Sequence, residues 1–127
     1  MANGTPIGRV RGLGPAHEGP HHWLVQRFTA IGNLFLMLWF GVSLALMSSY
    51  DYASMTDWLS GPLNSTLMAL LVISIFWHAR LGLQVLVEDY VHDAGTKFGV
   101  IAALNLATFA SVAFALICIA RIAFGAA

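Results

Sequence analysis

Three long apolar stretches, separated by short polar segments, dominate the sequence. They cover about residues 23–47, 63–90 and 98–124. Because about 20 residues of α-helix cross the roughly 30 Å hydrocarbon core of a bilayer, each stretch is long enough to span a membrane. Lipid offers no partner to backbone N–H and C=O groups, so each span is expected to be helical. The pattern predicts an all-α membrane protein with three transmembrane helices.

Composition agrees with a membrane protein and excludes several soluble classes. Apolar residues make up 58% of the chain and charged residues 9%, with a mean hydropathy of +0.75, whereas a soluble domain has roughly 25% charged residues. The 127 residues allow one domain, divided into an N-terminal segment of residues 1–22 and a three-helix transmembrane domain of residues 23–127. Six Lys and Arg and a net charge of zero argue against a nucleic-acid binder. Cys118, the single cysteine, stands in an apolar run as a small hydrophobe and supplies neither a disulfide nor a CxxC site.

The distribution of basic residues predicts the orientation in the membrane. Arg9, Arg11 and Arg27 precede or begin the first span, Lys97 follows the loop after the second span, and residues 48–62 contain no Lys or Arg. By the positive-inside rule the N-terminus and the second loop face the cytoplasm, while the first loop faces outward. Arg121 counts weakly against this assignment, because it can snorkel to the outer interface. No cleavable leader and no transit peptide are recognisable at the N-terminus, which favours a bacterial inner membrane.

His78 is the deepest polar residue of the second span. A titratable side chain at membrane depth costs at least about 2.5 kcal/mol, so its presence calls for a reason. Neutral imidazole is a common ligand of haem iron, and the small neighbours Ala79 and Gly82 would let a flat macrocycle approach the backbone. Two other interpretations stay open: His78 could hydrogen-bond a neighbouring helix, and Gly82 could serve helix packing.

Asp89 and Tyr90 lie at the end of the same span. Asp89 follows His78 by eleven residues, which is about three helical turns and roughly 16 Å along the axis, so the two share a helix face. With His78 pointing into the bundle, Asp89 and Tyr90 would mark its cytoplasmic mouth. There they could meet a quinone headgroup with a hydrogen-bond donor and a proton source, or they could be ordinary interfacial residues.

The charged residues Arg27 and Arg80 raise the same question. The guanidinium of Arg27 suits a carboxylate such as a haem propionate, although it could equally be a positive-inside anchor. Arg80 should be paired at its depth, yet it lies about 200° around the helix from His78. A propionate, Glu88 or a residue of another chain could each be its partner. Glu88 itself is expected to be solvated at the cytoplasmic edge.

These residues together resemble the hydrophobic membrane anchor of succinate dehydrogenase, the small cytochrome b subunit of respiratory complex II. The likeness rests on His78-Ala79, Gly82, Gln84-Val85-Leu86 and Asp89-Tyr90-Val91 in the second span, and on His21, Arg27, Thr29 and Ala30 at the start of the first. It covers nearly the whole chain, and the second-span motif is its most specific part.

The resemblance implies a role for each residue of the motif. His78 would be one axial ligand of haem b iron, with a histidine of a second, companion membrane anchor as the other. Arg27 and His21 would contact the haem propionates, Tyr90 would hydrogen-bond a ubiquinone carbonyl, and Asp89 would shape that site. The iron–sulfur protein and the flavoprotein of the complex would dock on the cytoplasmic side. The chain would thus belong to an enzyme without itself oxidising succinate.

Two rival functions fit the same composition. One is the anchor of a fumarate reductase, which runs the reverse reaction with menaquinone. The other is a cofactor-free subunit of a transporter or an assembly complex, in which His78 and Arg80 would line an ion or proton pathway. The spacing of His78, Asp89 and Tyr90 together with Arg27 favours the respiratory anchor, because a transporter has no reason to keep it.

Overall fold

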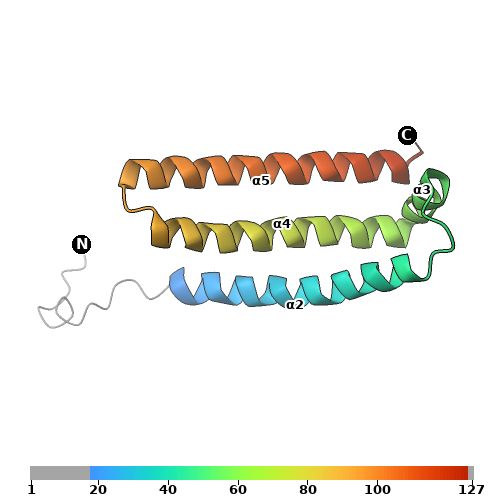
Figure 1. Cartoon of the computed structure of the whole chain (residues 1–127), viewed down its shortest axis with the longest axis horizontal. Coiled ribbons are helices and arrows are strands. Elements are labelled where there is room, and N and C mark those ends of the chain that lie inside the picture. Colours follow the sequence, from blue (N-terminus) through green and yellow to red (C-terminus); the bar gives the residue numbers. More distant parts are fainter. Residues whose placement is uncertain (1–17, 126–127) are drawn as a thin grey trace, which may run out of the picture.

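Three long helices lie side by side, as the sequence predicted. The structure is a computed structural model that describes residues 18–125, and these contain no strand. Its helices are α2 (Glu18–Ala45), α3 (Tyr52–Ser60), α4 (Pro62–Tyr90) and α5 (Ala94–Ala123). Figure 1 shows α4 between α2 and α5, with consecutive long helices running in opposite directions. The three long helices are apolar enough to cross a membrane, so the expected fold class is confirmed.

Local sequence signals determine where the long helices begin. Gly61 has an extended backbone and Pro62 occupies the first turn of α4, where a missing N–H costs nothing. Asp93 caps α5, its Oδ2 accepting a hydrogen bond of 2.7 Å from the backbone N–H of Thr96. That N–H holds the pKa of the Asp93 carboxyl below its usual value. Because of this cap, α5 begins at Ala94, four residues earlier than the apolar pattern suggested.

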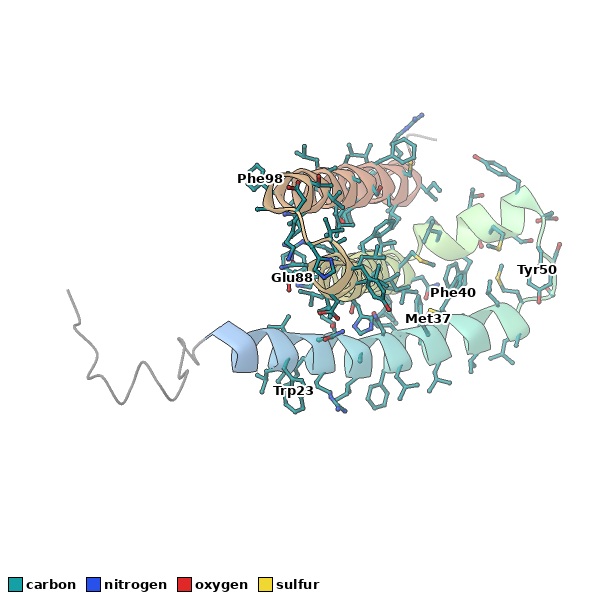
Figure 2. The ribbon with its side chains drawn as sticks, turned by 60° about the vertical axis from the view of Figure 1, so that its left-hand side comes forward. Trp23, Met37, Phe40, Tyr50, Glu88 and Phe98 are labelled. Atoms are coloured by element: carbon teal, nitrogen blue, oxygen red, sulfur yellow. The ribbon has the colours of Figure 1, made fainter. Side chains whose placement is uncertain are left out.

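The segment between the first two spans contains a short helix that the apolar pattern did not predict. The Oδ1 of Asp51 accepts a hydrogen bond of 2.8 Å from the backbone N–H of Ser54 and so caps α3. The same N–H lowers the pKa of the Asp51 carboxyl. Trp58 of α3 stacks on Trp39 of α2, with ring centroids 5.6 Å apart, and its ring centroid lies 6.2 Å from that of Phe40. Figure 2 shows Phe40 in the space between α2 and α3.

The bundle has a small interior and a large apolar exterior. Among the described residues only Leu71, Leu81 and Thr108 are buried. Many large apolar side chains are exposed on all three long helices, among them Phe28, and Phe98, which Figure 2 shows on the side of α5 remote from α4. In water such a surface would aggregate. Lipid or another apolar protein surface must therefore cover it.

Candidate functional site

His78 contacts α2 through one nitrogen of its ring. It stands on α4, which is helical without a break from Pro62 to Tyr90, and its side chain is half-buried. Its Nδ1 lies 3.0 Å from the hydroxyl oxygen of Thr29 on α2. Its Nε2 has no hydrogen-bond partner among the described residues. The helix-to-helix hydrogen bond considered from the sequence therefore exists, and it leaves the second nitrogen available for a ligand.

Beside the ring lies a groove on the outer surface of α2 and α4. Its volume is about 370 Å³, and its walls are Trp23, Gln26, Arg27, Ala30 and His78. From the sequence, His78 was expected to point into the bundle. The ring is half-buried between α4 and α2, with Nδ1 against Thr29, and it also borders this surface groove.

Arg27 stands in the same groove as His78. Its guanidinium carbon lies 5.0 Å from the ring centroid of Trp23, close enough for a cation–π interaction. Figure 2 shows Trp23 on the outer side of α2, where it is 57% exposed. The Arg27 side chain is also exposed, so its planar donors can reach an anionic group in the groove. His21 lies on the first turns of α2, but its side chain is outside the described part of the structure.

Asp89 and Tyr90 are not brought into this groove. Both are exposed on the last turn of α4, Tyr90 at 76%, and neither side chain has a partner among the described residues. Because α4 is continuous, the eleven residues between His78 and Asp89 correspond to about 16 Å along the helix axis. The structure therefore shows two separate places along α4. One is the groove beside His78, and the other is the helix end, where Asp89 lies on the same face as His78 and Tyr90 about 120° around the helix from it.

Arg80 has a partner that was not expected from the sequence. Its Nε donates a hydrogen bond to Oδ1 of Asn105 on α5, and its guanidinium carbon lies 5.3 Å from the ring centroid of Trp77. Glu88, one of the expected partners, is exposed and accepts a 2.8 Å bond from the Gln84 amide instead. Asn105 could have been noticed as a polar residue inside an apolar span.

The donor set at the groove fits a prosthetic group that brings most of its own ligands. Among the side chains that the structure describes, residues 23–125, no group of three or more His, Cys, Asp or Glu is able to hold a metal ion. A lone imidazole can bind iron that is already held by a porphyrin. A Cβ added at Gly82, which is exposed one turn beyond His78, would meet nothing within 4 Å. A flat macrocycle could therefore approach α4 here, with Arg27 near its carboxylates, and a second protein would have to supply the opposite wall.

The fold and the groove together define a class of protein, a multi-pass membrane protein with a candidate cofactor groove on its surface. The comparisons with known proteins name the family. Residues 1–118 match the family described as succinate dehydrogenase/fumarate reductase transmembrane subunit, and the chain belongs to this family.

Several relatives carry matching names. The succinate dehydrogenase hydrophobic membrane anchor subunit of Rickettsia bellii is 36% identical over 86 residues, 67% of this chain and 68% of the relative. The protein of the same name from Paracoccus denitrificans is 27% identical over 122 residues, 96% of this chain and 94% of the relative. The succinate dehydrogenase membrane anchor subunit of Reclinomonas americana is 33% identical over 84 residues, 63% of this chain and 69% of the relative.

Family membership confirms the resemblance drawn from the second-span motif. It decides against the rival interpretation as part of a transporter or an assembly complex. The bacterial relatives and the three apolar helices also agree with the expected location, a multi-pass protein of a bacterial inner membrane.

Proposed function

We propose that this chain is the membrane anchor of a succinate dehydrogenase, that it holds one side of haem b and that it forms part of the ubiquinone-reduction site. The observation that carries the proposal is the arrangement of His78, whose Nδ1 contacts Thr29 while Nε2 stays available next to the groove. That is the arrangement expected of an imidazole that ligates a metal through one nitrogen and is oriented through the other.

The groove residues divide the binding of haem b between them. His78 would supply one nitrogen ligand to the haem iron, and a histidine of the companion membrane anchor would supply another. Arg27, exposed on the same groove, pairs with a propionate, and His21, six residues earlier in the chain, makes a second contact with the propionates. When bound, the haem accepts and passes on single electrons. The protein's part is to hold the imidazole in one orientation and to keep the propionate end near the membrane surface.

Asp89 and Tyr90 serve the quinone at the cytoplasmic end of α4. The Tyr90 hydroxyl, exposed and without a partner among the described residues, donates a hydrogen bond to a quinone carbonyl. Asp89 beside it takes protons from the cytoplasm and passes them toward the reduced quinone. Their position at a helix end, rather than deep in the membrane, gives water access to the site where protons are consumed.

Succinate oxidation itself belongs to other proteins of the complex. The sequence contains one cysteine, Cys118, which is exposed, so the chain cannot ligate an iron–sulfur cluster through four thiolates. The electrons must come from the iron–sulfur protein, which receives them from the flavoprotein. Both would dock at the cytoplasmic side, near Asp89 and Tyr90.

Affinity purification of the tagged chain from gently solubilised membranes tests the assembly. We expect the flavoprotein, the iron–sulfur protein and the second membrane anchor to purify with it, together with succinate:ubiquinone reductase activity. Purification with transport components and without that activity would refute the proposal.

Two substitutions test the individual roles in the purified complex. His78→Ala should remove or shift the reduced-minus-oxidised spectrum of a b-type haem, whereas His92→Ala, in the loop before α5, should leave it unchanged. Tyr90→Phe should lower ubiquinone reduction while succinate oxidation by an artificial soluble acceptor persists. An equal loss of both activities in Tyr90→Phe would show an effect on assembly instead of on the quinone site.

A further inference from the structure

The Thr29 hydroxyl contacts more groups than its single hydrogen can serve. Its oxygen lies 3.0 Å from the backbone carbonyl of Val25, 3.0 Å from that of Gln26 and 3.0 Å from Nδ1 of His78. A hydroxyl donates one hydrogen bond and can accept two. When it donates to the carbonyls of its own helix, its lone pairs face the imidazole and can only accept.

We propose that Thr29 is the positioning residue of the haem ligand, which rests on the function proposed above. The His78 Nδ1–H donates to the Thr29 oxygen, so the proton of the neutral ring stays on Nδ1 and the lone pair of Nε2 points to the iron. The reverse arrangement, with the hydroxyl donating to Nδ1, would leave the proton on Nε2 and block coordination. The two helix carbonyls give the hydroxyl hydrogen another acceptor and so favour the coordinating tautomer.

The packing of α2 against α4 supports this assignment. Gly32, one turn after Thr29, faces Ser74, one turn before His78, and a Cβ on Gly32 would lie 3.8 Å from the Ser74 oxygen. The two helices therefore approach closely at this level. This close approach keeps the acceptor oxygen of Thr29 within hydrogen-bond reach of the ring.

A hydrogen bond of this kind has electronic as well as geometric effects. Donation from Nδ1–H increases the basicity of Nε2, and a more basic ligand stabilises the ferric more than the ferrous state. Loss of the acceptor should therefore raise the midpoint potential of the haem. It should also weaken haem binding by about 10–100-fold, the typical effect of losing such an outer partner of a metal ligand.

The test uses the purified intact complex with three variants of Thr29. Thr29→Val keeps the shape and removes the hydroxyl, and Thr29→Cys replaces it with a weak acceptor. Both should raise the haem midpoint potential, change the g-values of the oxidised haem in electron paramagnetic resonance and lower haem occupancy. Thr29→Ser keeps the hydroxyl and should behave as the unaltered protein.

Thr108→Val is the matched control, because the Thr108 hydroxyl is buried and donates only to the Leu104 carbonyl of its own helix at 2.8 Å. It should leave potential and g-values unchanged. Unaltered values in both Thr29→Val and Thr29→Cys, or a shifted potential in Thr29→Ser, would overturn the role of Thr29 while leaving His78 as the ligand. If the complex that carries none of these substitutions contained no haem, the proposed function itself would be overturned.

Discussion

The bond between Arg80 and Asn105 should stabilise the packing of α4 against α5, and Asn105→Leu is the change that tests it. The Arg80 Nε donates to the Asn105 amide oxygen, and among the described residues the guanidinium also makes a cation–π interaction with the Trp77 ring. Leucine has the same branching at Cγ as asparagine and suits the apolar surroundings. The substitution therefore removes the acceptor and leaves the cation at membrane depth.

Three contributions determine the expected size of the effect. A hydrogen bond to a charged group contributes about 1.5–3 kcal/mol, but hydrogen bonds between transmembrane helices average only about 0.6 kcal/mol with a maximum of about 1.7. In Asn105→Leu the cation–π interaction with Trp77 remains, and it still stabilises the Arg80 cation by about 0.5–2 kcal/mol. We therefore expect Asn105→Leu to lower the free energy of unfolding by about 1–2 kcal/mol.

Removing the cation should lower the free energy of unfolding less than removing its acceptor. Arg80→Leu eliminates the same hydrogen bond but leaves a neutral amide, Asn105, without its partner in place of a cation, and an unpaired neutral group costs less than an unpaired charge. The single variant should therefore lose less stability than Asn105→Leu. The double variant should be more stable than Asn105→Leu alone, because no unpaired charge is left.

Unfolding of the purified chain in bicelles, measured by steric trapping, gives these free energies. Ala107→Leu is the control, since it introduces the same side chain at an exposed position two residues along α5. A coupling energy between Arg80 and Asn105 below about 0.3 kcal/mol, which is within the usual error of additivity, would refute the reasoning.

Three further predictions concern the ends and the surface of the bundle. In the folded protein the Thr96 N–H lowers the pKa of the Asp93 carboxyl below its usual value of 3.8. The ionised carboxylate therefore stabilises α5 above pH 3.8, and this stabilisation is lost as the pH falls through the lowered pKa. Asp93→Asn should reduce this acid dependence, which thermal unfolding in detergent from neutral to strongly acidic pH would measure. Trp58→Ala removes two aromatic contacts, at about 0.5–1.5 kcal/mol each, and should lower the free energy of unfolding by about 1–3 kcal/mol, whereas an unchanged value would show that α3 is held by lipid alone. Gly82→Trp should lower the haem content of the complex, measured as pyridine haemochrome. Gly82→Ala should leave it unchanged, because nothing in the described part of this chain lies within 4 Å of the added Cβ. Equal haem content in both variants would place the macrocycle elsewhere.

The three spans could be predicted from sequence because the membrane imposes one requirement on all of them. A helix must be long and apolar to cross, so residues 23–47 and 63–90 were recognisable without knowing what they contact. The α3 helix was not recognised because nine residues are too few for a clear period. The local sequence signal for this helix was Asp51, which stands three residues before Ser54. This capping pattern also occurs in turns.

The surroundings of the candidate site were harder to predict than its residues. Helical geometry correctly separated His78 from Arg80 by about 200°, and the structure shows them facing α2 and α5 respectively. The sequence could not show that the groove lies at the edge of the bundle. Lipid-facing and protein-facing surfaces are both apolar here, so composition does not reveal which side of α4 has a neighbour.

The most direct test of the His78 assignment is chemical rescue of its deletion. His78→Gly should remove or shift the b-type reduced-minus-oxidised spectrum of the purified complex, and added imidazole, entering the space beside Thr29, should restore it. An unchanged spectrum in His78→Gly without imidazole would contradict the assignment of His78 as the iron ligand.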